Sequence, residues 1–388
     1  MSEREPGPAI GLIGAGSRGV FHLEQLYEIV SRDYFEVWDK PWPAAKPGFP
    51  FGVYHDYASE VPDWATDISG LGASVTAVCD PSTDSRARAV AVCEEHGDDP
   101  DTFETIEAFY RDGEFDTVIV ASPNHTHTKA ALPGLERDLD VFCEKPLAAT
   151  LADHDRLIDA ADQSDGTFYV GFNLRHSQQY GKLRSLIQAG AIGRLGMLSA
   201  HEVRVPFPWG HYYTQDESGG TLLEKDCHDF DLFNWYTGSD PVRVVAFGGQ
   251  HVLDHGTDVN DHATVIVEYE SGVKATLELC MYAPYTQPGD RVYAARGTDG
   301  LVRSGRDSSS WEVFGWDAHD TYSFTNTGGE HGGADIRMWK DVLQTFADGG
   351  DPAATARDAK KAAAVAIGAE RSIAEGRIVE IDERYDLH

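Results

Sequence analysis

The stretch AIGLIGAGSRG, residues 9–19, joins a short apolar run to three spaced glycines. The residues after it, 20–30, place apolar side chains at the three- and four-residue spacing of a helix. We therefore expect a strand, a tight turn and a helix. The turn reads G-x-G-x-x-G through Gly14, Gly16 and Gly19, which is the dinucleotide-binding pattern in the context that this pattern requires.

Each glycine of this turn has a separate physical task. The first permits the turn, the second lets the backbone approach a pyrophosphate, and the third allows the helix to pack closely on the strand. The unpaired N–H groups at the start of the helix then face the phosphates. A purely structural glycine turn remains the alternative. The cofactor-binding residues expected from this segment are Gly14, Gly16, Ser17, Arg18 and Gly19.

The second strand of such a fold arrives late in the chain. Residues 74–82, SVTAVCDPS, form a strand-like run that leads to Asp80, far beyond the usual distance of about 20 residues from the first glycine. The intervening residues 31–72 are rich in aromatic residues and proline, so we expect an insertion that packs on its own domain, forms an interface or covers the cofactor. The Asp80 carboxylate would accept the ribose hydroxyls of adenosine and repel a 2′-phosphate. This favours NAD, although Arg86 and Arg88 keep NADP open.

Two more strand-like runs end in polar residues. The first, 118–121, precedes SPNHTH, and the second, 140–143, precedes EKP. Strands that alternate with helices indicate a parallel, doubly wound sheet, whose ligands bind beyond the carboxyl ends of the strands. The pair His125 and His127 has no third ligand nearby, so no metal is expected. The cofactor contacts expected at these strand ends are Ser122, Pro123, Asn124, His127, Glu144 and Lys145.

The pattern changes from about residue 195 onward. Strand-like runs are joined by turns such as Ser271-Gly272, which is typical of an antiparallel sheet. Two late helices are expected, around 333–348 and 355–375. The fold class is thus α/β followed by α+β. An N-terminal Rossmann domain, 9–172, precedes a C-terminal domain, 173–388, with a large, mostly antiparallel, open-faced sheet.

Charge and composition limit the function. The chain has 64 acidic and 32 basic residues and a net charge of −32, which resembles the composition of proteins from extreme halophiles. Such a surface repels nucleic acid and is tolerable when concentrated salt screens it. No apolar run is long enough to cross a membrane, no signal peptide is recognisable, and the five scattered cysteines lack a C-x-x-C pair. We expect a cytoplasmic protein that binds neither nucleic acid nor membrane.

The ordered set of motifs resembles the Gfo/Idh/MocA family, NAD(P)-dependent oxidoreductases that act mostly on sugars and cyclitols. The resemblance runs from residue 9 to the C-terminus. The motifs that carry it are GAGSRG (14–19), CDP (79–81), SPNHTH (122–127), CEKPL (143–147), GFNLR (171–175), GAIGRL (190–195), GG (219–220), HDFDLFNW (228–235) and GGADIRMW (332–339).

The resemblance implies three catalytic residues. It places a lysine, Lys145, in the E-K-P element, where Pro146 is a candidate for a cis peptide bond. It places a histidine, His228, in the second domain, with an acidic residue four positions earlier. This chain has Glu224 there, where many relatives have Asp, and this departure puts the role of Glu224 in question.

The residue types suit the oxidation of a carbinol. Its proton must leave as hydride passes to nicotinamide C4, so a base such as His228 is needed, and a cation such as Lys145 stabilises the developing alkoxide. Glu224 shares a face with His228 if residues 219–235 are helical, and would then orient the imidazole, with Asp231 as an alternative partner. The charged stretch 219–235 is thereby interpreted as part of a catalytic site and not as a metal site.

The expected function is hydride transfer between nicotinamide and a sugar, cyclitol or related polyol. Two alternatives remain open, an NAD-dependent glycosidase of the same fold and a sensor that binds NAD and sugar without turnover. Arg175 and His176 are candidates for the substrate cleft, with a structural role equally open, and Tyr212, Tyr213 and His331 are further candidates. The resemblance also implies a homodimer or homotetramer that associates through the open face of the second sheet.

Overall fold

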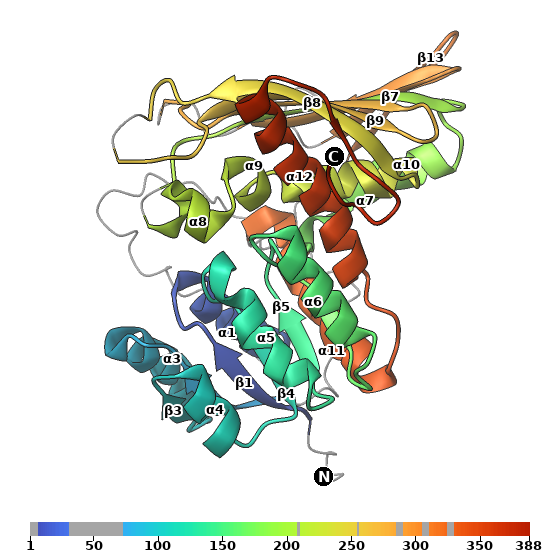
Figure 1. Ribbon diagram of the computed structural model, residues 1–388. Coiled ribbons are helices and arrows are strands. Elements are labelled where there is room, and N and C mark those ends of the chain that lie inside the picture. The colour runs from blue at the N-terminus through green and yellow to red at the C-terminus, as the bar shows by residue number, and fades with distance from the viewer. Residues whose placement is uncertain are drawn as a thin grey trace.

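The structure is a computed structural model that describes residues 7–30, 73–207, 210–253, 256–284, 290–304, 310–323 and 330–388. The insertion expected at 31–72 lies outside the described residues. Figure 1 shows the N-terminal strands in the lower half and a second sheet across the top. Within the described ranges, no helix is both long and apolar enough to cross a membrane.

The N-terminal half contains a six-stranded parallel sheet with the order β3-β2-β1-β4-β5-β6. The strands are β1 (Ala9–Ile13), β2 (Ser74–Cys79), β3 (Asp101–Phe103), β4 (Thr117–Val120), β5 (Asp140–Cys143) and β6 (Phe168–Val170). The strand order reverses between β1 and β4, and a sheet of this kind binds its ligand in the crevice beyond the strand ends at that point. The expected Rossmann fold is confirmed.

Several helices of this half are capped at their N-terminus by a serine or threonine side chain. The helices are α1 (Ser17–Val30), α3 (Thr83–Glu95), α4 (Ile106–Asp112), α5 (His127–Leu135) and α6 (Leu151–Ala161). The side chains of Ser82, Thr105 and Thr150 accept hydrogen bonds from backbone N–H groups in the first turns of α3, α4 and α6. Those N–H groups have no partner within the helix, so the caps fix where each helix starts.

The C-terminal half contains a nine-stranded sheet with the order β14-β13-β12-β11-β7-β10-β9-β8-β15. The pair β7–β10 is parallel and the other neighbours are antiparallel. The strands are β7 (Leu195–Val203), β8 (Pro241–Gly249), β9 (His262–Tyr269), β10 (Lys274–Cys280), β11 (Asp290–Gly297), β12 (Gly300–Ser304), β13 (Ser310–Gly315), β14 (His319–Ser323) and β15 (Val379–Glu380).

Helices cover one face of this second sheet, and no described helix covers the other face. The covering helices, beneath the sheet in Figure 1, are α7 (Gln178–Gln188), α10 (Cys227–Thr237) and α12 (Ala356–Glu375). Along β9, Val265 and Val267 are buried, whereas Thr264 and Ile266 face outward. Phe247 of β8 pairs with Thr264 and is 77% exposed on the outer face. The expected open-faced, mostly antiparallel sheet is confirmed.

Helix α11 (Ala334–Asp348) returns to the N-terminal half although it lies late in the chain. Its buried side chains Met338 and Trp339 belong to the same apolar cluster as Leu12 of β1 and Leu23 of α1. The proposed domain division at residue 172 therefore places α11 with the second domain by sequence, whereas α11 packs on the first sheet. This return brings the GGAD segment to the Rossmann half.

Candidate active site

The glycine-rich turn between β1 and α1 has the geometry of a dinucleotide cradle. Gly14 has φ +93°, and a Cβ there would lie 2.5 Å from the backbone nitrogen of Ser122. A Cβ on Gly19 would lie 1.9 Å from the carbonyl oxygen of Gly14, so the third glycine lets α1 pack on the turn. A Cβ on Gly16 would meet nothing within 4 Å, which leaves open space where a pyrophosphate would approach the backbone. The residues present fit a bound dinucleotide.

Asp80 closes the same turn from the end of β2. Its Oδ2 accepts a hydrogen bond from the backbone N–H of Ala15 at 2.9 Å, and its Oδ1 accepts one from Ser82 at 2.8 Å. The carboxylate thus lies beside the glycine-rich turn, where the ribose of a dinucleotide is expected. Arg86 donates to the backbone oxygen of Asp80 and to Thr83.

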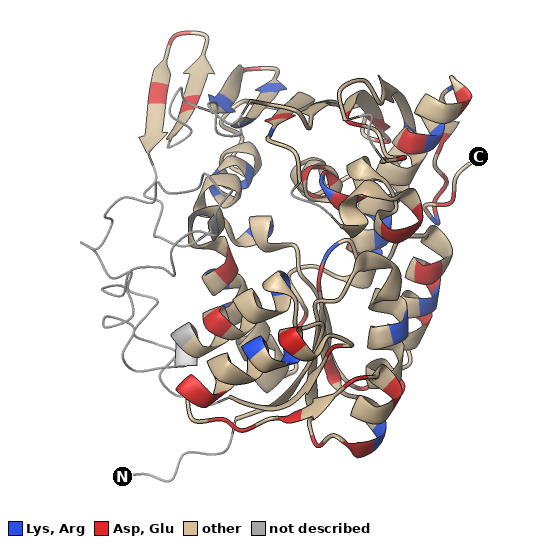
Figure 2. Ribbon diagram, turned by 90° about the vertical axis from the view of Figure 1, so that its left-hand side faces the viewer, with Lys and Arg blue, Asp and Glu red and all other residues tan. Residues whose placement is uncertain are grey.

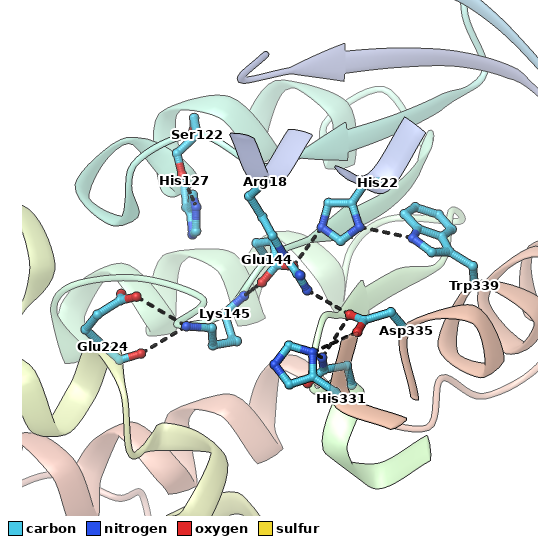
Figure 3. A network of polar contacts seen from close by, with 11 residues as sticks. Arg18, His22, Ser122, His127, Glu144, Lys145, Glu224, His331, Asp335 and Trp339 are labelled. Atoms are coloured by element: carbon cyan, nitrogen blue, oxygen red, sulfur yellow. Dashed lines mark hydrogen bonds and ion pairs between the residues drawn. The ribbon is translucent and has the colours of Figure 1, made fainter. Parts of the chain in front are cut away.

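Lys145 lies at the end of β5 and points toward the C-terminal half (Figure 3). The peptide bond between Lys145 and Pro146 is cis, as expected. The Lys145 Nζ donates to the backbone oxygen of Glu224 at 3.0 Å and lies 3.3 Å from its Oε1. Burial disfavours the ammonium, but the Glu224 carboxylate and other nearby anionic groups outweigh burial and raise the Lys145 pKa. Lys145 is therefore a cation at neutral pH.

Two residues expected to bind cofactor, Asn124 and His127, form hydrogen bonds within the protein. Asn124, which is buried, donates to the backbone oxygen of Ser218 at 3.0 Å and to the Glu224 carboxylate. Both ring nitrogens of His127 contact backbone oxygens, Nδ1 that of Pro146 at 2.9 Å and Nε2 that of Ser122 at 2.7 Å. Asn124 thus holds Glu224 in place beside Lys145, and His127 shapes the loop before α5.

The expected pairing of Glu224 with His228 on one helix is corrected by the structure. Residues 219–235 form two helices, α9 (Thr221–Glu224) and the start of α10, with a break at residues 225–226. Glu224 and His228 therefore do not share one face of a continuous helix. The Glu224 carboxylate contacts Lys145 and Asn124 instead, so Glu224 holds the lysine.

His228 lies in the first turn of α10 and is 7% exposed. Its ring packs edge-on against Phe172, with the centroids 5.9 Å apart, and its Nδ1 has no hydrogen-bond partner among the described residues. Burial, followed by the cations Lys145, Arg291 and Lys225, lowers the His228 pKa well below its ordinary value. The imidazole is therefore neutral at neutral pH and can accept a hydrogen bond.

The remaining charges of residues 225–231 have partners elsewhere in the protein, with one exception. The Lys225 Nζ lies 3.1 Å from Glu202 Oε1, and the Arg291 NH2 lies 2.8 Å from Asp229 Oδ2. Asp226 is fully buried, and neither of its oxygens has a hydrogen-bond partner within the described ranges. Those ranges also contain no group of three or more His, Cys, Asp or Glu side chains arranged to hold a metal ion.

The two substrate candidates have structural partners. Arg175 forms two bonds with Asp231, its Nε to Oδ2 at 2.8 Å and its NH2 to Oδ1 at 2.5 Å, and is 7% exposed. Asp231 is thereby also unavailable to His228. His176 bonds the hydroxyl of Tyr169 at 2.9 Å. This geometry favours the structural interpretation of Arg175 and His176.

Tyr212 and Tyr213 border the same region. The Tyr212 ring stacks on Phe207 with the centroids 4.5 Å apart. Burial and the neighbouring Glu224 carboxylate raise the Tyr212 pKa, so this phenol stays protonated beside the Lys145–Glu224 pair. The Tyr213 hydroxyl donates to the backbone oxygen of Phe207, which is a structural role.

A polar network around Glu144, the residue before Lys145, includes His22 and Trp339, which were not predicted from the sequence. Glu144 accepts from Arg18 at 2.6 Å, from His22 at 2.7 Å and from the backbone N–H of Lys145 at 2.9 Å (Figure 3). Trp339 donates to His22 Nδ1 at 3.0 Å, so His22 Nε2 carries the proton that Glu144 accepts. Burial opposes ionisation of Glu144, but Arg18 and His22 outweigh burial and hold the Glu144 pKa well below its usual range.

The sequence contained a signal for one part of this network, the pair Arg18 and His22, but not for the contact between Arg18 and Asp335. His22 follows Arg18 by four residues, so the two lie on one face of α1. The Arg18 NH2 also reaches Asp335 Oδ1 at 3.0 Å, across 317 positions of sequence. No local spacing could reveal that pair, although Asp335 belongs to the GGAD motif that carries the family resemblance.

Comparisons with known proteins agree with this geometry. Residues 51–172 match the model described as "Oxidoreductase family, NAD-binding Rossmann fold", and residues 180–303 match the model described as "GFO/IDH/MocA C-terminal domain". The chain belongs to the Gfo/Idh/MocA family. Among curated family members, the myo-inositol 2-dehydrogenase of Thermotoga maritima is 28% identical over 70% of this chain and 81% of its own length. The inositol 2-dehydrogenase of Corynebacterium glutamicum is 31% identical, but the match spans 54% of this chain and 59% of the relative.

Solved structures share the Gfo/Idh/MocA fold over nearly the whole chain. A levoglucosan dehydrogenase in complex with NADH and levoglucosan has a TM-score of 0.77 at 18% identity, and the match covers 96% of this chain and 99% of the other. A putative myo-inositol dehydrogenase from Sinorhizobium meliloti has a TM-score of 0.71 at 23% identity, covering 97% and 100%. These likenesses extend the shared fold to both halves.

Proposed function

We propose that the protein is an NAD-dependent oxidoreductase that transfers hydride between nicotinamide and a carbinol or carbonyl of a sugar, cyclitol or related polyol. The observation that carries this proposal is the position of Lys145. The Rossmann half presents its ammonium beside the dinucleotide cradle, and the C-terminal half meets it with Glu224. The names of similar proteins, which include inositol and levoglucosan dehydrogenases, support this substrate class.

The glycine-rich turn and Asp80 are the residues that would hold the cofactor. NAD is favoured over NADP because Asp80 places a carboxylate beside the turn, where a 2′-phosphate would be repelled. When bound, the nicotinamide supplies the hydride acceptor. Ser122, Pro123 and Glu144 are proposed as further cofactor contacts, and the Arg18–Glu144 pair joins the turn to the strand end that carries Lys145.

Lys145 and His228 are proposed to flank the reacting carbinol. The Lys145 ammonium would stabilise negative charge on the carbinol oxygen, and Glu224 with Asn124 would hold the ammonium in position. The neutral imidazole of His228 would accept the proton of the hydroxyl as hydride leaves for nicotinamide. These groups lie in a largely buried region, where a charge–charge interaction is stronger than in water.

Three further properties belong to the proposal. The excess of acidic side chains supports a protein adapted to concentrated salt. The uncovered apolar residues of the second sheet support a homodimer or homotetramer. The scattered, unpaired cysteines support a reducing, cytoplasmic location.

The decisive experiment is a substrate screen of the full chain in molar KCl. Inositols, levoglucosan, aldoses and sugar acids are offered with NAD or NADP, and the absorbance of the reduced nicotinamide is followed together with loss of substrate. The proposal expects NADH to form at the same rate as polyol is consumed. Substrate loss without free NADH would favour a glycosidase, and binding without turnover would favour a sensor.

A further inference from the structure

Glu370 of α12 contacts the start of α9, the short helix that ends in Glu224, and the proposed mechanism does not use this contact. Glu370 Oε1 accepts a hydrogen bond from the backbone N–H of Leu222 at 3.1 Å. Glu370 Oε2 accepts a hydrogen bond from the side-chain amide of Asn260. Both donors are neutral amides, so a neutral acceptor of the same shape could take the place of the carboxylate in these two bonds.

Helix α9 takes the acceptor for its first turn from a distant part of the chain. Its N-cap residue is Gly220, which has no side chain to accept a bond from the N–H groups of that turn. Glu370 supplies the acceptor from 148 positions away in the chain. A Cβ on Gly220 would lie 2.8 Å from Glu370 Oε1, so the glycine leaves room for the carboxylate. The Thr221 hydroxyl adds a second link, since it donates to the backbone oxygen of Asn260 at 2.6 Å.

The four residues of α9 connect this cap to the ammonium of Lys145. The N–H of Glu224 donates to the backbone oxygen of Gly220 at 2.9 Å, so the position of Glu224 follows from the first turn of the helix. The Lys145 Nζ donates to the backbone oxygen of Glu224 at 3.0 Å and lies 3.3 Å from its Oε1. A shift of α9 would therefore move both oxygens that Lys145 contacts.

Helix α12 also contacts the Rossmann half, which carries Lys145. The Lys360 Nζ lies 2.7 Å from Oδ1 of Asp155 on α6, and the Lys360 side chain is 5% exposed. Lys360 and Glu370 lie about 15 Å apart along the axis of this one helix. Figure 1 shows α12 alongside α6 and extending to the second sheet. One continuous helix thus relates the cap of α9 to the half that presents Lys145.

We propose that Glu370 is a positioning residue of the active site, which holds Glu224 against Lys145 by capping α9 from α12. The catalytic value of this contact rests on the proposed function, whereas the contact itself does not. Glu370 acts through α9 and not through contact with substrate or cofactor. Its role is to keep the Lys145 ammonium charged and placed for the carbinol oxygen.

The pKa of Lys145 reports whether Glu224 is in place. Burial disfavours the ammonium, and the Glu224 carboxylate is the largest of the influences that outweigh burial and raise the Lys145 pKa. If α9 moves away, burial is opposed less and the Lys145 pKa should fall. The other titratable groups near Lys145, which substitution of Glu370 leaves unchanged, are Glu144, Tyr212, Cys227 and His228.

The test compares variants of α12 in the full chain. Glu370→Ala removes the acceptor for the Leu222 N–H, whereas Glu370→Gln keeps an oxygen there and lacks only the charge. Ser372→Ala is the matched control on the same helix. The buried Ser372 hydroxyl accepts from the backbone N–H of Ala246 in β8 at 2.9 Å and donates to the backbone oxygen of Arg377 at 2.6 Å. This control removes buried hydrogen bonds of α12 and leaves the cap of α9 unchanged.

Two readouts separate positioning from a general loss of stability. Competitive acetylation across a pH series, with the Lys145 peptide quantified by mass spectrometry, gives the Lys145 pKa without any substrate. The pH dependence of kcat, with NAD and the polyol that the substrate screen identifies, follows the same ionisation during turnover. We expect Glu370→Ala to lower the Lys145 pKa and the alkaline limb of kcat by about 1 pH unit or more, and kcat itself by about tenfold. Glu370→Gln should restore most of this loss, and Ser372→Ala should keep the wild-type Lys145 pKa.

An unchanged Lys145 pKa in Glu370→Ala would overturn the proposal, as would an equal fall in Ser372→Ala. If Glu370→Ala does not fold, Glu370→Asp carries the same test, because a carboxylate shortened by one methylene is withdrawn from the Leu222 N–H. In a Glu224→Gln background, Glu370→Ala should lower the Lys145 pKa no further, since Glu370 acts through Glu224, and a further fall would contradict this. If the Lys145 pKa falls as expected but the wild-type chain oxidises no polyol, the contact is upheld and the proposed function fails.

Discussion

Lys145 lies where the two halves of the protein meet. Its neighbour Glu144 is bonded to Arg18 and His22 of the Rossmann half, and its Nζ is bonded to Glu224 of the C-terminal half. Glu224 reaches the lysine because α9 ends there and the chain turns before α10. The Glu224 side chain thus has a partner of its own in Lys145.

Replacing Lys145 tests the electrostatic part of the proposed mechanism. Lys145→Ala removes the cation that stabilises the developing alkoxide, and we expect kcat to fall by about 10³-fold. NADH affinity, measured by fluorescence, should stay at the wild-type value, because the cradle is built by other residues. Lys129→Ala, at a lysine whose side chain is 63% exposed, is the control and should keep full activity. Full activity of Lys145→Ala would contradict the mechanism.

Asp226 offers a prediction about stability and pH. Burial, followed by the nearby Asp229 and Glu202, raises the Asp226 pKa well above its ordinary value, so the folded protein keeps this proton when the unfolded chain releases it. This costs stability as pH rises above about 4, and Asp226→Asn should remove the cost. We expect the free energy of unfolding at pH 7 to rise by about 1 kcal/mol or more, with a smaller gain near pH 4.5.

The control for this prediction is Asp229→Asn, in the first turn of α10, the helix that begins directly after Asp226. Asp229 bonds Arg291 and Tyr293, so its neutralisation leaves a buried cation with one partner fewer. We expect that variant to be less stable than wild type in the same chemical denaturation series. If Asp226→Asn were also destabilising at pH 7, the prediction would be wrong, and the Asp226 carboxyl would make a stabilising interaction in the folded protein.

The element that determines cofactor binding is the turn between β1 and α1. The space around the three glycines of this turn differs, although all three are part of the same sequence pattern. Gly14 and Gly19 have backbone atoms where a Cβ would stand, and Gly16 has open space. The first and third glycines are therefore needed for folding, and the second is needed for the ligand.

A matched pair of alanine variants separates these two needs. Gly16→Ala should fold with the melting temperature of wild type, because its methyl group meets nothing, but should lose NADH affinity by about tenfold or more through contact with the pyrophosphate. Gly19→Ala should lower the melting temperature, because its Cβ would lie 1.9 Å from a backbone oxygen. Differential scanning calorimetry without cofactor and NADH titration give the two readouts. Unchanged NADH affinity in Gly16→Ala would place the cofactor elsewhere.

Over the described part of the molecule, acidic residues lie on elements of both halves (Figure 2). With a net charge of −32, repulsion acts on the folded state in dilute buffer. The screening length falls from about 10 Å in 0.1 M salt to about 3 Å in 1 M salt. We expect the melting temperature to rise from 0.1 to 2 M KCl, and to rise less at pH 4.5, where carboxylates are partly protonated. A melting temperature independent of KCl would contradict salt adaptation.

The open face of the second sheet carries the prediction about assembly. Phe247 is 77% exposed and Ile266 is 43% exposed, so Phe247→Asp should dissociate an oligomer formed through this face while leaving the fold intact. Light scattering coupled to size exclusion in molar KCl measures the mass. Trp316→Asp, at an 85% exposed residue beyond β13, is the control and should not change the mass. A wild-type monomer, or an oligomer that survives Phe247→Asp, would contradict this interface.

Patterns along the chain determined the architecture of this protein. The glycine-rich turn, the apolar strands and the later strand-like runs joined by turns predicted both sheets, because strand and helix periodicity depend on neighbouring residues. The E-K-P element likewise located Lys145 at a strand end, and the cis bond at Pro146 followed from that motif. These features are local, so a sequence contains them.

Only the tertiary structure decided how the candidate site is assembled. The break between α9 and α10 separated Glu224 from His228, and Asp231 proved to be bonded to Arg175. Asp335 came to Arg18 because α11 packs its apolar face on the Rossmann sheet, across 317 positions of chain. Contacts of that kind depend on which apolar surfaces bury one another over the whole fold, and residue spacing holds no record of them.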